Sequence, residues 1–286
     1  MIYLAKVQEA RYPRLEIRRP LRKGSLARGC SMTIGVGFLC RDGIVIGSDR
    51  QMTVQDSHTF TQEKTDSFST EQGLVAWTYA GMGDTGKLFR DQIRERFAST
   101  VDRSRLSVTA YMQDVLKRVT KKEEPFYTLL GFCPSGGDGH FLLMSNGTDV
   151  VNVDRSEIIG GGDSSLLRFL RQLYLYFPFT PTLTQGAYSA VYSISQAAKF
   201  EGQWCGGGID VWAIGTKGKS FVVTPGVADK WQKYMDGVEF KFYALLRVLT
   251  DDEMSDKRKT DEWKDFRENV ARFCVQICPN QSNTFQ

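Results

Sequence analysis

Residues 33–49 read TIGVGFLCRDGIVIGSD, two apolar runs that are separated by Arg41-Asp42-Gly43. Both runs are rich in β-branched and other large apolar side chains, a composition that favours strands. An Asp-Gly pair between two such runs is a strong signal for a tight hairpin turn. The stretch therefore predicts two antiparallel strands, with Thr33 at the start of the first and Asp49 at the end of the second.

Short apolar runs and amphipathic segments alternate along the rest of the chain. We predict further strands at 73–81, 127–133, 141–146, 150–154, 206–215 and 220–224, and helices at 85–97, 106–120, 166–176 and 184–199. A glycine-rich turn at 158–165 is expected to open the third of these helices. Strands that alternate with pairs of helices indicate a layered α+β fold. The charged residues 225–286 are interpreted as a helical C-terminal extension.

The composition of the 286 residues, 41% hydrophobic and 12% aromatic, is that of a globular protein with a sizeable core. No apolar run approaches the roughly 18 residues of a membrane span, so no membrane association is predicted. The six cysteines lack the spacing of metal ligands, which favours reduced thiols and a cytoplasmic location. With two histidines in the chain, a histidine-rich metal site is not expected, and no cofactor is predicted.

The net charge of +4 is unevenly distributed. Residues 1–31 carry eight Lys or Arg and two Glu, which gives this leader a charge of +6 and leaves the remainder at −2. The main part of the chain therefore lacks the basic surface of a nucleic-acid-binding protein. The leader is predicted to be disordered, removed or mis-assigned, with a nucleic-acid arm or an organelle transit sequence as the alternatives.

Two glycine motifs resemble nucleotide-binding loops. Residues 81–86, GMGDTG, fit G-x-G-x-x-G, but a hairpin precedes them and no acidic residue follows at the expected distance of about 20 residues. Gly218-Lys219-Ser220 resembles the end of a phosphate-binding loop, but Ala213 stands where that motif requires glycine. Neither motif predicts a bound nucleotide.

Thr33, Asp49 and Lys64 have the chemistry that an N-terminal nucleophile needs. A threonine hydroxyl is a weak nucleophile and requires a neighbouring base, which its own α-amine, with a pKa near 8, can provide if the chain begins there. A lysine beside the hydroxyl favours its ionised form, and an aspartate orients the lysine. The amide of Gly81, at the end of a predicted strand, is a candidate donor to the oxyanion.

The order of these motifs resembles that of proteasome β-type subunits and bacterial proteasome-like peptidases. The resemblance rests on the 33–53 segment, Lys64, the turn AGMGD at 80–84, GGGDSSL at 160–166 and GGGIDVWAIG at 206–215, and it covers residues 32–224. It implies a four-layer αββα sandwich of the N-terminal-nucleophile hydrolase type, usually assembled into rings.

The same resemblance implies roles for single residues. Thr33 matches the nucleophile, Asp49 and Lys64 the charged pair behind it, and Gly81 the oxyanion glycine. Asp163 or Ser164 stands where the family usually has a supporting serine. The implied function is that of a threonine-type peptidase that cleaves peptides or unfolded proteins within a homo-oligomeric ring, with an ATP-dependent unfoldase as a possible partner.

Two departures from the family pattern leave alternatives open. Met32 precedes Thr33 where active subunits have glycine, and residues 202–205, GQWC, replace an Asp-x-x-Ser element, with Glu201 as a candidate substitute. A non-catalytic proteasome-like subunit and a hydrolase of small amides are therefore the alternatives. We expect Met32 to be the true initiator, because methionine is readily removed before threonine and its removal exposes the α-amine of Thr33.

Overall fold

The computed structural model describes residues 33–54, 58–99, 102–121, 126–136, 139–160, 180–200, 205–218, 220–251 and 253–277. The helix predicted at 166–176 and the candidate site residues Asp163 and Ser164 lie outside the described residues.

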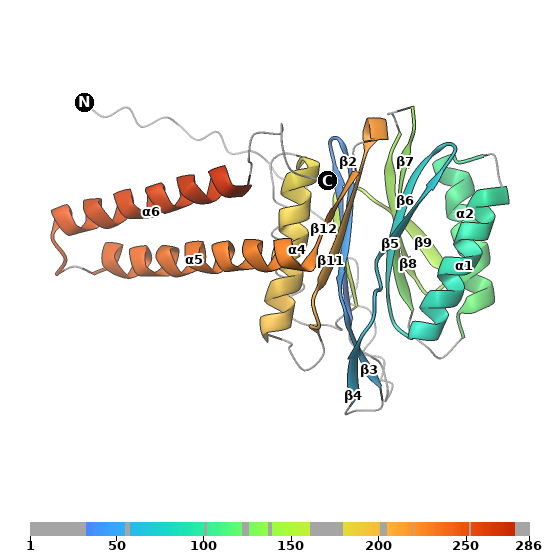
Figure 1. Ribbon diagram of the computed structural model, residues 1–286, viewed down its shortest axis with the longest axis horizontal. Helices are drawn as coiled ribbons and strands as arrows, with labels where there is room; N and C mark the ends of the chain where they lie inside the picture. Colours follow the sequence, from blue (N-terminus) through green and yellow to red (C-terminus); the bar gives the residue numbers. More distant parts are fainter. Residues whose placement is uncertain are drawn as a thin grey trace, which may run out of the picture.

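Two five-stranded antiparallel sheets form the centre of the protein (Figure 1). The first has the order β10-β1-β2-β11-β12, formed by β1 (Ile34–Cys40), β2 (Gly43–Asp49), β10 (Ser156–Gly160), β11 (Ile209–Gly215) and β12 (Ser220–Val223). The second runs in sequence order, with β5 (Asp66–Thr70), β6 (Gly73–Ala80), β7 (Tyr127–Pro134), β8 (Phe141–Asn146) and β9 (Asp149–Val153). A separate pair, β3 (Gln51–Val54) and β4 (His58–Thr61), joins the two sheets along the chain.

The hairpin predicted at the Asp42-Gly43 turn is confirmed. β1 and β2 pair antiparallel, with Cys40 opposite Gly43. Gly43 has a φ of 151°, and a Cβ on it would lie 2.2 Å from the carbonyl oxygen of Ile214, so this position has no room for a side chain. All seven residues of β2 are buried, because the strand lies in the middle of the sheet and both of its faces are covered.

Helices cover the outer faces of the packed sheets (Figure 1). α1 (Gly83–Ser99) and α2 (Arg105–Val119) lie on the second sheet, and α4 (Leu183–Phe200) lies on the first. Buried apolar side chains form one cluster beneath α1 and α2, one between the sheets and one beneath α4. The predicted α+β class is therefore confirmed, and the core is divided among three interfaces.

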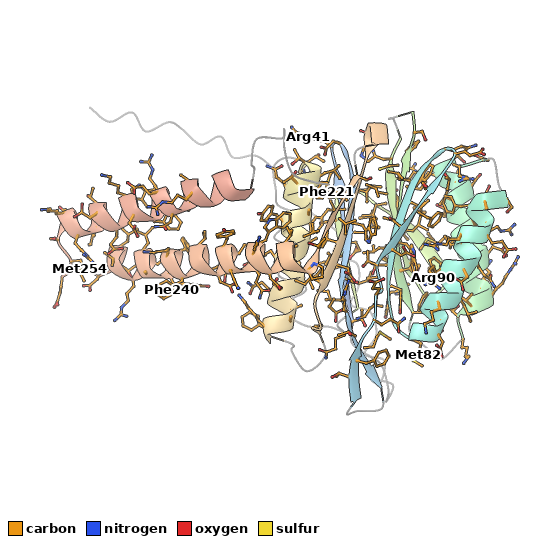
Figure 2. The ribbon with its side chains drawn as sticks, viewed as in Figure 1. Arg41, Met82, Arg90, Phe221, Phe240 and Met254 are labelled. Atoms are coloured by element: carbon orange, nitrogen blue, oxygen red, sulfur yellow. The ribbon has the colours of Figure 1, made fainter. Side chains whose placement is uncertain are left out.

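The C-terminal part forms a helical hairpin that projects from the sheets (Figure 1). It consists of α5 (Pro225–Leu249) and α6 (Asp256–Ile277), and many of its side chains point outward (Figure 2). The first turns of α5 nevertheless belong to the core, since Trp231 stacks on Tyr188 of α4 with ring centroids 3.9 Å apart. Among the described residues, no helix is long and apolar enough to cross a membrane.

Four of the strands were not predicted from the sequence: β3, β4, β5 and β10. Ile158 and Ile159, expected in a turn, belong to β10 and pair with β1. This strand is five residues long and runs into glycines, so its two-residue period was too short to recognise. β6, which precedes the GMGDTG motif, has antiparallel neighbours on both sides, unlike the parallel strand of a dinucleotide-binding unit.

Candidate active site

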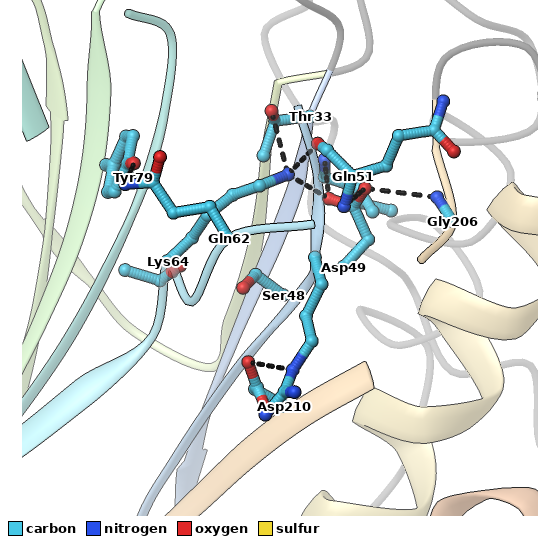
Figure 3. Close-up of polar contacts among 12 residues, drawn as sticks. Thr33, Ser48, Asp49, Gln51, Gln62, Lys64, Tyr79, Gly206 and Asp210 are labelled. Carbon is cyan, nitrogen blue, oxygen red and sulfur yellow. Dashed lines mark hydrogen bonds and ion pairs between the residues drawn. The ribbon is translucent and has the colours of Figure 1, made fainter. Parts of the chain in front are cut away.

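The structure brings Thr33, Asp49 and Lys64 into direct contact (Figure 3). Lys64 Nζ donates to Thr33 Oγ1 at 3.1 Å and to Asp49 Oδ1 at 2.9 Å. Thr33 immediately precedes β1, Asp49 ends β2, and Lys64 lies between β4 and β5. The hairpin therefore places the hydroxyl and the carboxylate on adjacent strands, and the lysine reaches both from the following segment.

Four donors surround the carboxylate of Asp49. Oδ1 accepts from Lys64 Nζ and, at 3.1 Å, from the backbone N–H of Ile34. Oδ2 accepts from the backbone N–H groups of Gln51 and Gly206, each at 3.1 Å. Because all four of these neighbours are donors, the ionised carboxylate is the form that matches its surroundings.

The ammonium group of Lys64 has three acceptors, one for each of its hydrogens. Besides Thr33 Oγ1 and Asp49 Oδ1, it donates to the carbonyl oxygen of Gln51. These three bonds fix the orientation of the ammonium group. Since the Thr33 oxygen accepts from Lys64, the hydroxyl proton of Thr33 must point elsewhere, where a base could receive it.

The ion pair is enclosed, with the side chains of Lys64 and Asp49 both 0% exposed. Burial lowers the pKa of Lys64 from its ordinary value, and the charge of Asp49 opposes this change. Burial also raises the pKa of Asp49, against the effect of Lys64 and the backbone donors. A buried pair of this kind gives little stability compared with apolar side chains of the same size, so its presence favours a chemical role.

A glycine segment, Gly206–Gly208, holds the chain that follows Asp49. All three glycines have positive φ values, of 153°, 70° and 105°. The carbonyl oxygen of Gly206 accepts from the backbone N–H groups of Arg50 and Gln51, at 3.0 and 2.9 Å, while its own N–H donates to Asp49. This segment therefore supports the carboxylate through its backbone, and sequence reasoning did not identify that contribution.

Arg50 connects the site to β11. Its Nε and Nη2 donate to the two carboxylate oxygens of Asp210, at 2.8 and 2.5 Å. Nη2 also reaches Glu63, the residue before Lys64, at 3.4 Å. Arg50 thus ties together the segments that carry Asp49 and Lys64. Arg50 and Asp210 are 160 residues apart in the chain, so the sequence did not indicate that they pair.

Gly81 follows β6 with a φ of 135° and is buried. The preceding residue, Ala80, lies beside Thr33: a Cβ built on Gly160 would be 1.7 Å from the Thr33 carbonyl oxygen and 2.8 Å from the Ala80 methyl group. The end of β6, the end of β10 and the start of β1 therefore meet at one point. Gly81 is next to this point along the chain, and its role as an oxyanion donor stays a prediction.

Further polar residues near the site were missed by sequence reasoning. Ser48 and Thr65 share a hydrogen bond of 2.7 Å, and Thr65 donates to Thr78 at 3.2 Å. Gln62 Nε2 donates to the hydroxyl of Tyr79 at 3.2 Å, and burial raises the pKa of Tyr79 to about 12. These contacts join the segment around Lys64 to β6.

The segment before Gly206 contains the remaining candidate residues that the sequence suggested. Cys205 is a buried cysteine directly before the glycine segment, while Glu201 and residues 202–204 lie outside the described residues. Within the described part of the chain, no group of three or more His, Cys, Asp or Glu side chains is placed to hold a metal ion. Thr33 itself is 0% exposed, so a substrate could not reach its hydroxyl in this structure.

No protein-family model matches the sequence, and no curated protein matches it. Solved structures do match. Anbu (ancestral beta-subunit) from Yersinia bercovieri aligns with a TM-score of 0.63 at 14% identity, over 74% of this chain and 97% of its own. Anbu from Hyphomicrobium sp. strain MC1 aligns with a TM-score of 0.58 at 11% identity, over 73% of this chain and 97% of its own.

A third similar structure is described as a helical assembly of the Anbu complex from Pseudomonas aeruginosa. It aligns with a TM-score of 0.57 at 15% identity, over 74% of this chain and 96% of its own. The TM-scores establish a shared fold, whereas sequence identities this low leave the activity of this chain open. This chain therefore has the proteasome-like fold of the Anbu proteins.

Proposed function

We propose that this chain is a threonine-type amide hydrolase of the N-terminal-nucleophile class, with the four-layer αββα architecture of that class and peptide bonds as its substrate. The observation that carries the proposal is the 3.1 Å hydrogen bond from Lys64 Nζ to Thr33 Oγ1, made by a lysine that is fully buried with Asp49. A lysine on the surface would stay hydrated, and a threonine with only a structural role in a strand would not need a buried ammonium group beside its hydroxyl.

The proposed reaction needs a chain that begins at Thr33. Thr33 Oγ1 attacks the carbonyl carbon, and the α-amine of the same residue accepts the hydroxyl proton. The amine then passes this proton to the leaving nitrogen as the C–N bond breaks, which leaves an ester on Thr33. Water, deprotonated by the same amine, attacks the ester, and the hydroxyl of Thr33 is restored as the acid leaves.

Lys64 and Asp49 act on the nucleophile through charge and orientation. The ammonium of Lys64 stabilises negative charge that develops on Thr33 Oγ1, and Asp49 keeps that ammonium in place. In the proposal, the amide of Gly81 donates to the oxyanion of the tetrahedral intermediate. Asp163 and Ser164 remain candidates for positioning the amine.

The proposed mechanism needs a free α-amine on Thr33, and so requires the removal of the residues that precede it. We propose that residues 32–224 encode the hydrolase core, that this core becomes active once Met32, alone or with the longer leader, is removed, and that residues 225–286 are an addition to it. The proposed substrate is unfolded polypeptide, cleaved within a homo-oligomer, and an unfoldase partner remains a prediction. The helical assembly described for the Anbu complex of Pseudomonas aeruginosa supports assembly from several copies.

The decisive experiment compares three chains that all begin at residue 33: the natural sequence, Thr33→Ser and Thr33→Ala. Each is incubated with a peptide epoxyketone, an electrophile that needs a hydroxyl and an adjacent free amine. Intact-mass measurement should find one adduct on the natural chain, a slower adduct on Thr33→Ser and none on Thr33→Ala. The full-length 286-residue chain should not react.

Equal labelling of Thr33→Ala would refute the nucleophile assignment. Absence of any adduct on a folded chain that begins at Thr33 would favour the second candidate, a non-catalytic subunit. The specific observation in favour of that candidate is that Thr33 is 0% exposed.

A further inference from the structure

A groove lies between α5 and α6 on the surface of the helical hairpin. The two helices lie side by side (Figure 1), and their side chains leave a hollow of about 320 Å³ between them. Lys233, Gly237 and Lys241 of α5 line it at intervals of four residues, so they form one row along that helix. Asn269 and Arg272 line it from α6. The groove is therefore built by one side of each helix.

Gly237 makes the groove deep. A Cβ on this residue would have no heavy atom within 4 Å beyond its own stretch of helix. Glycine inside a helix destabilises it relative to alanine, and the described neighbours leave room for a side chain here. Packing therefore gives no reason for glycine at this position, whereas a ligand that enters the groove would need the space.

All charged side chains that line the groove are cationic. They are Lys233, Lys241 and Arg272, and no Asp or Glu lines it. Lys241 pairs with Asp265 at 2.8 Å, and Arg272 lies 3.8 Å from Glu268, which is close to the limit for an ion pair. Lys233 makes no ion pair with any residue that the structure describes. The groove therefore keeps positive charge that its own hairpin does not neutralise.

The acidic side chains in the same part of α5 face α4. Asp236 pairs with Lys199 of α4 at 2.5 Å, and Glu239 accepts a hydrogen bond from Gln196 of α4 at 3.1 Å. The hairpin as a whole, residues 225–277, has ten Lys or Arg and eleven Asp or Glu, so its net charge is −1. The positive charge of the groove thus comes from the separation of charges over different sides of α5.

Neutral groups complete the lining of the groove. Tyr234 and Val238 supply apolar surface, and Tyr234 also carries a hydroxyl. The side-chain nitrogen of Asn269 donates twice to Asp265, at 2.7 and 3.1 Å, which leaves the Asn269 oxygen available as an acceptor. A peptide matches this combination, because it brings a backbone N–H together with its side chains.

We propose that this groove binds an acidic segment of a partner protein. One apolar side chain of the segment lies over Gly237, and carboxylates on either side of it contact Lys233 and Arg272. Opposite charges guide such a segment to the groove and fix its register. A volume of about 320 Å³ is at the lower end of the roughly 300–1,000 Å³ of small-molecule sites, so it suits one anchoring side chain.

The net charge of the hairpin disfavours a nucleic acid as the ligand. A nucleic acid is a long anion that needs a continuous basic surface, and it would also meet the eleven acidic residues of the hairpin. A short acidic segment reaches the groove alone.

The test uses the full-length chain and a short synthetic peptide as the probe. The peptide consists of glutamates around a central benzoylphenylalanine, a photoreactive aromatic residue, and carries a fluorescent label. Fluorescence anisotropy should find saturable binding that weakens as salt is added. After illumination, mass spectrometry should locate the crosslink within residues 233–241 or 269–272. The same peptide with lysine in place of glutamate should not bind.

Gly237→Leu fills the groove and should weaken binding of the acidic peptide at least about tenfold. Gly226→Leu is the matched control, because Gly226 also has open space at its Cβ position but lies in the first turn of α5, outside the groove. It should bind the peptide as the natural chain does. Circular dichroism establishes that both variants are folded.

A second pair of variants keeps the test decisive if Gly237→Leu does not fold. Lys233→Glu combined with Arg272→Glu reverses the charge of the groove at exposed positions and should weaken binding at least about tenfold. Lys257→Glu combined with Arg267→Glu changes the net charge equally on α6, at residues that do not line the groove. This control should keep the affinity of the natural chain.

Four results would each overturn the proposal: no saturable binding of the acidic peptide up to about 1 mM, equal binding of the lysine peptide, a crosslink outside the groove, or equal losses in the control variants. Displacement of the probe by N-acetylphenylalanine as effective as that by the unlabelled peptide would identify a small-molecule site instead. The proposal does not rest on the activity proposed for Thr33, and a chain with Thr33→Ala should bind the probe equally well.

Discussion

Proteins usually bury apolar side chains and expose charged ones. The cluster around Thr33 buries charged side chains, whereas the α5–α6 hairpin exposes aromatic ones. The cluster encloses an ion pair, Lys64 with Asp49, whose side chains are 0% exposed. The hairpin places Phe240 and Tyr243 outside, and its ion pair of Lys241 with Asp265 is in contact with solvent. Enclosed charge and exposed aromatic surface both carry a cost, so each indicates a region shaped by something other than stability.

The largest effect should come from breaking the buried ion pair with Lys64→Met. This change leaves the Asp49 carboxylate buried without its cation and should lower the free energy of unfolding by about 4 kcal/mol. Urea denaturation measures the loss. Combining Lys64→Met with Asp49→Asn should cost less than the sum of the single changes. A loss below about 1 kcal/mol for Lys64→Met would mean that water reaches the pair.

A methyl group at Gly160 should have the next largest effect. The Cβ would lie 1.7 Å from the carbonyl oxygen of Thr33, at a residue with a φ of 81°. Gly160→Ala should therefore cost about 3 kcal/mol, from backbone strain and displacement of Thr33. Gly147→Ala is the matched control, because Gly147 has a φ of 61° but has open space around the Cβ position, and it should cost about 1 kcal/mol. Equal losses would show that Thr33 can move at little cost.

Arg50→Gln tests the connection between the site and β11. The substitution removes both hydrogen bonds to Asp210, whose side chain is 9% exposed, and should cost about 2 kcal/mol in urea denaturation. Arg90→Gln is the control, since the Arg90–Asp91 pair lies on the surface and should contribute little. If the two variants lose the same free energy of unfolding, the Arg50–Asp210 contact contributes no more than an ion pair on the surface.

Lys241→Met makes in the hairpin the same chemical change as Lys64→Met makes in the site, but it should lower the urea midpoint at neutral pH only slightly, because both partners of the ion pair are partly exposed. The hydrogen bond from Lys241 holds the pKa of Asp265 below its usual value. Any contribution is therefore present above the ordinary aspartate pKa and is lost as the pH falls through the lowered value. Carboxyl NMR should find a higher pKa for Asp265 in the variant, and salt should reduce the difference.

Much of the site was predictable because its side chains have distinct chemistry. The Asp42-Gly43 turn fixed the register of β1 and β2, which set Thr33 and Asp49 on neighbouring strands. The resemblance to proteasome β-type subunits pointed to Lys64. The structure places all three residues in contact, whereas their catalytic roles remain proposals.

The parts that sequence could not provide are mostly backbone groups. The carbonyl of Gln51 and the N–H of Gly206 bind the ion pair, but every residue type except proline offers the same groups. The β10 strand was obscured by the glycines after it. The apolar spacing in α5 is visible in the sequence, but which part of the helix packs on α4 depends on how the two helices are placed relative to each other.

The position of β1 in its sheet has a consequence for a chain that begins at Thr33. Chain ends commonly fray, yet β1 lies between β10 and β2 and pairs with β10 from Ile34 and with β2 from Gly35. The amides at the start of this strand should then exchange with solvent only when the whole domain unfolds. A terminus secured on both sides has already lost its conformational entropy, so the proposed nucleophile would be on one of the most rigid parts of the protein.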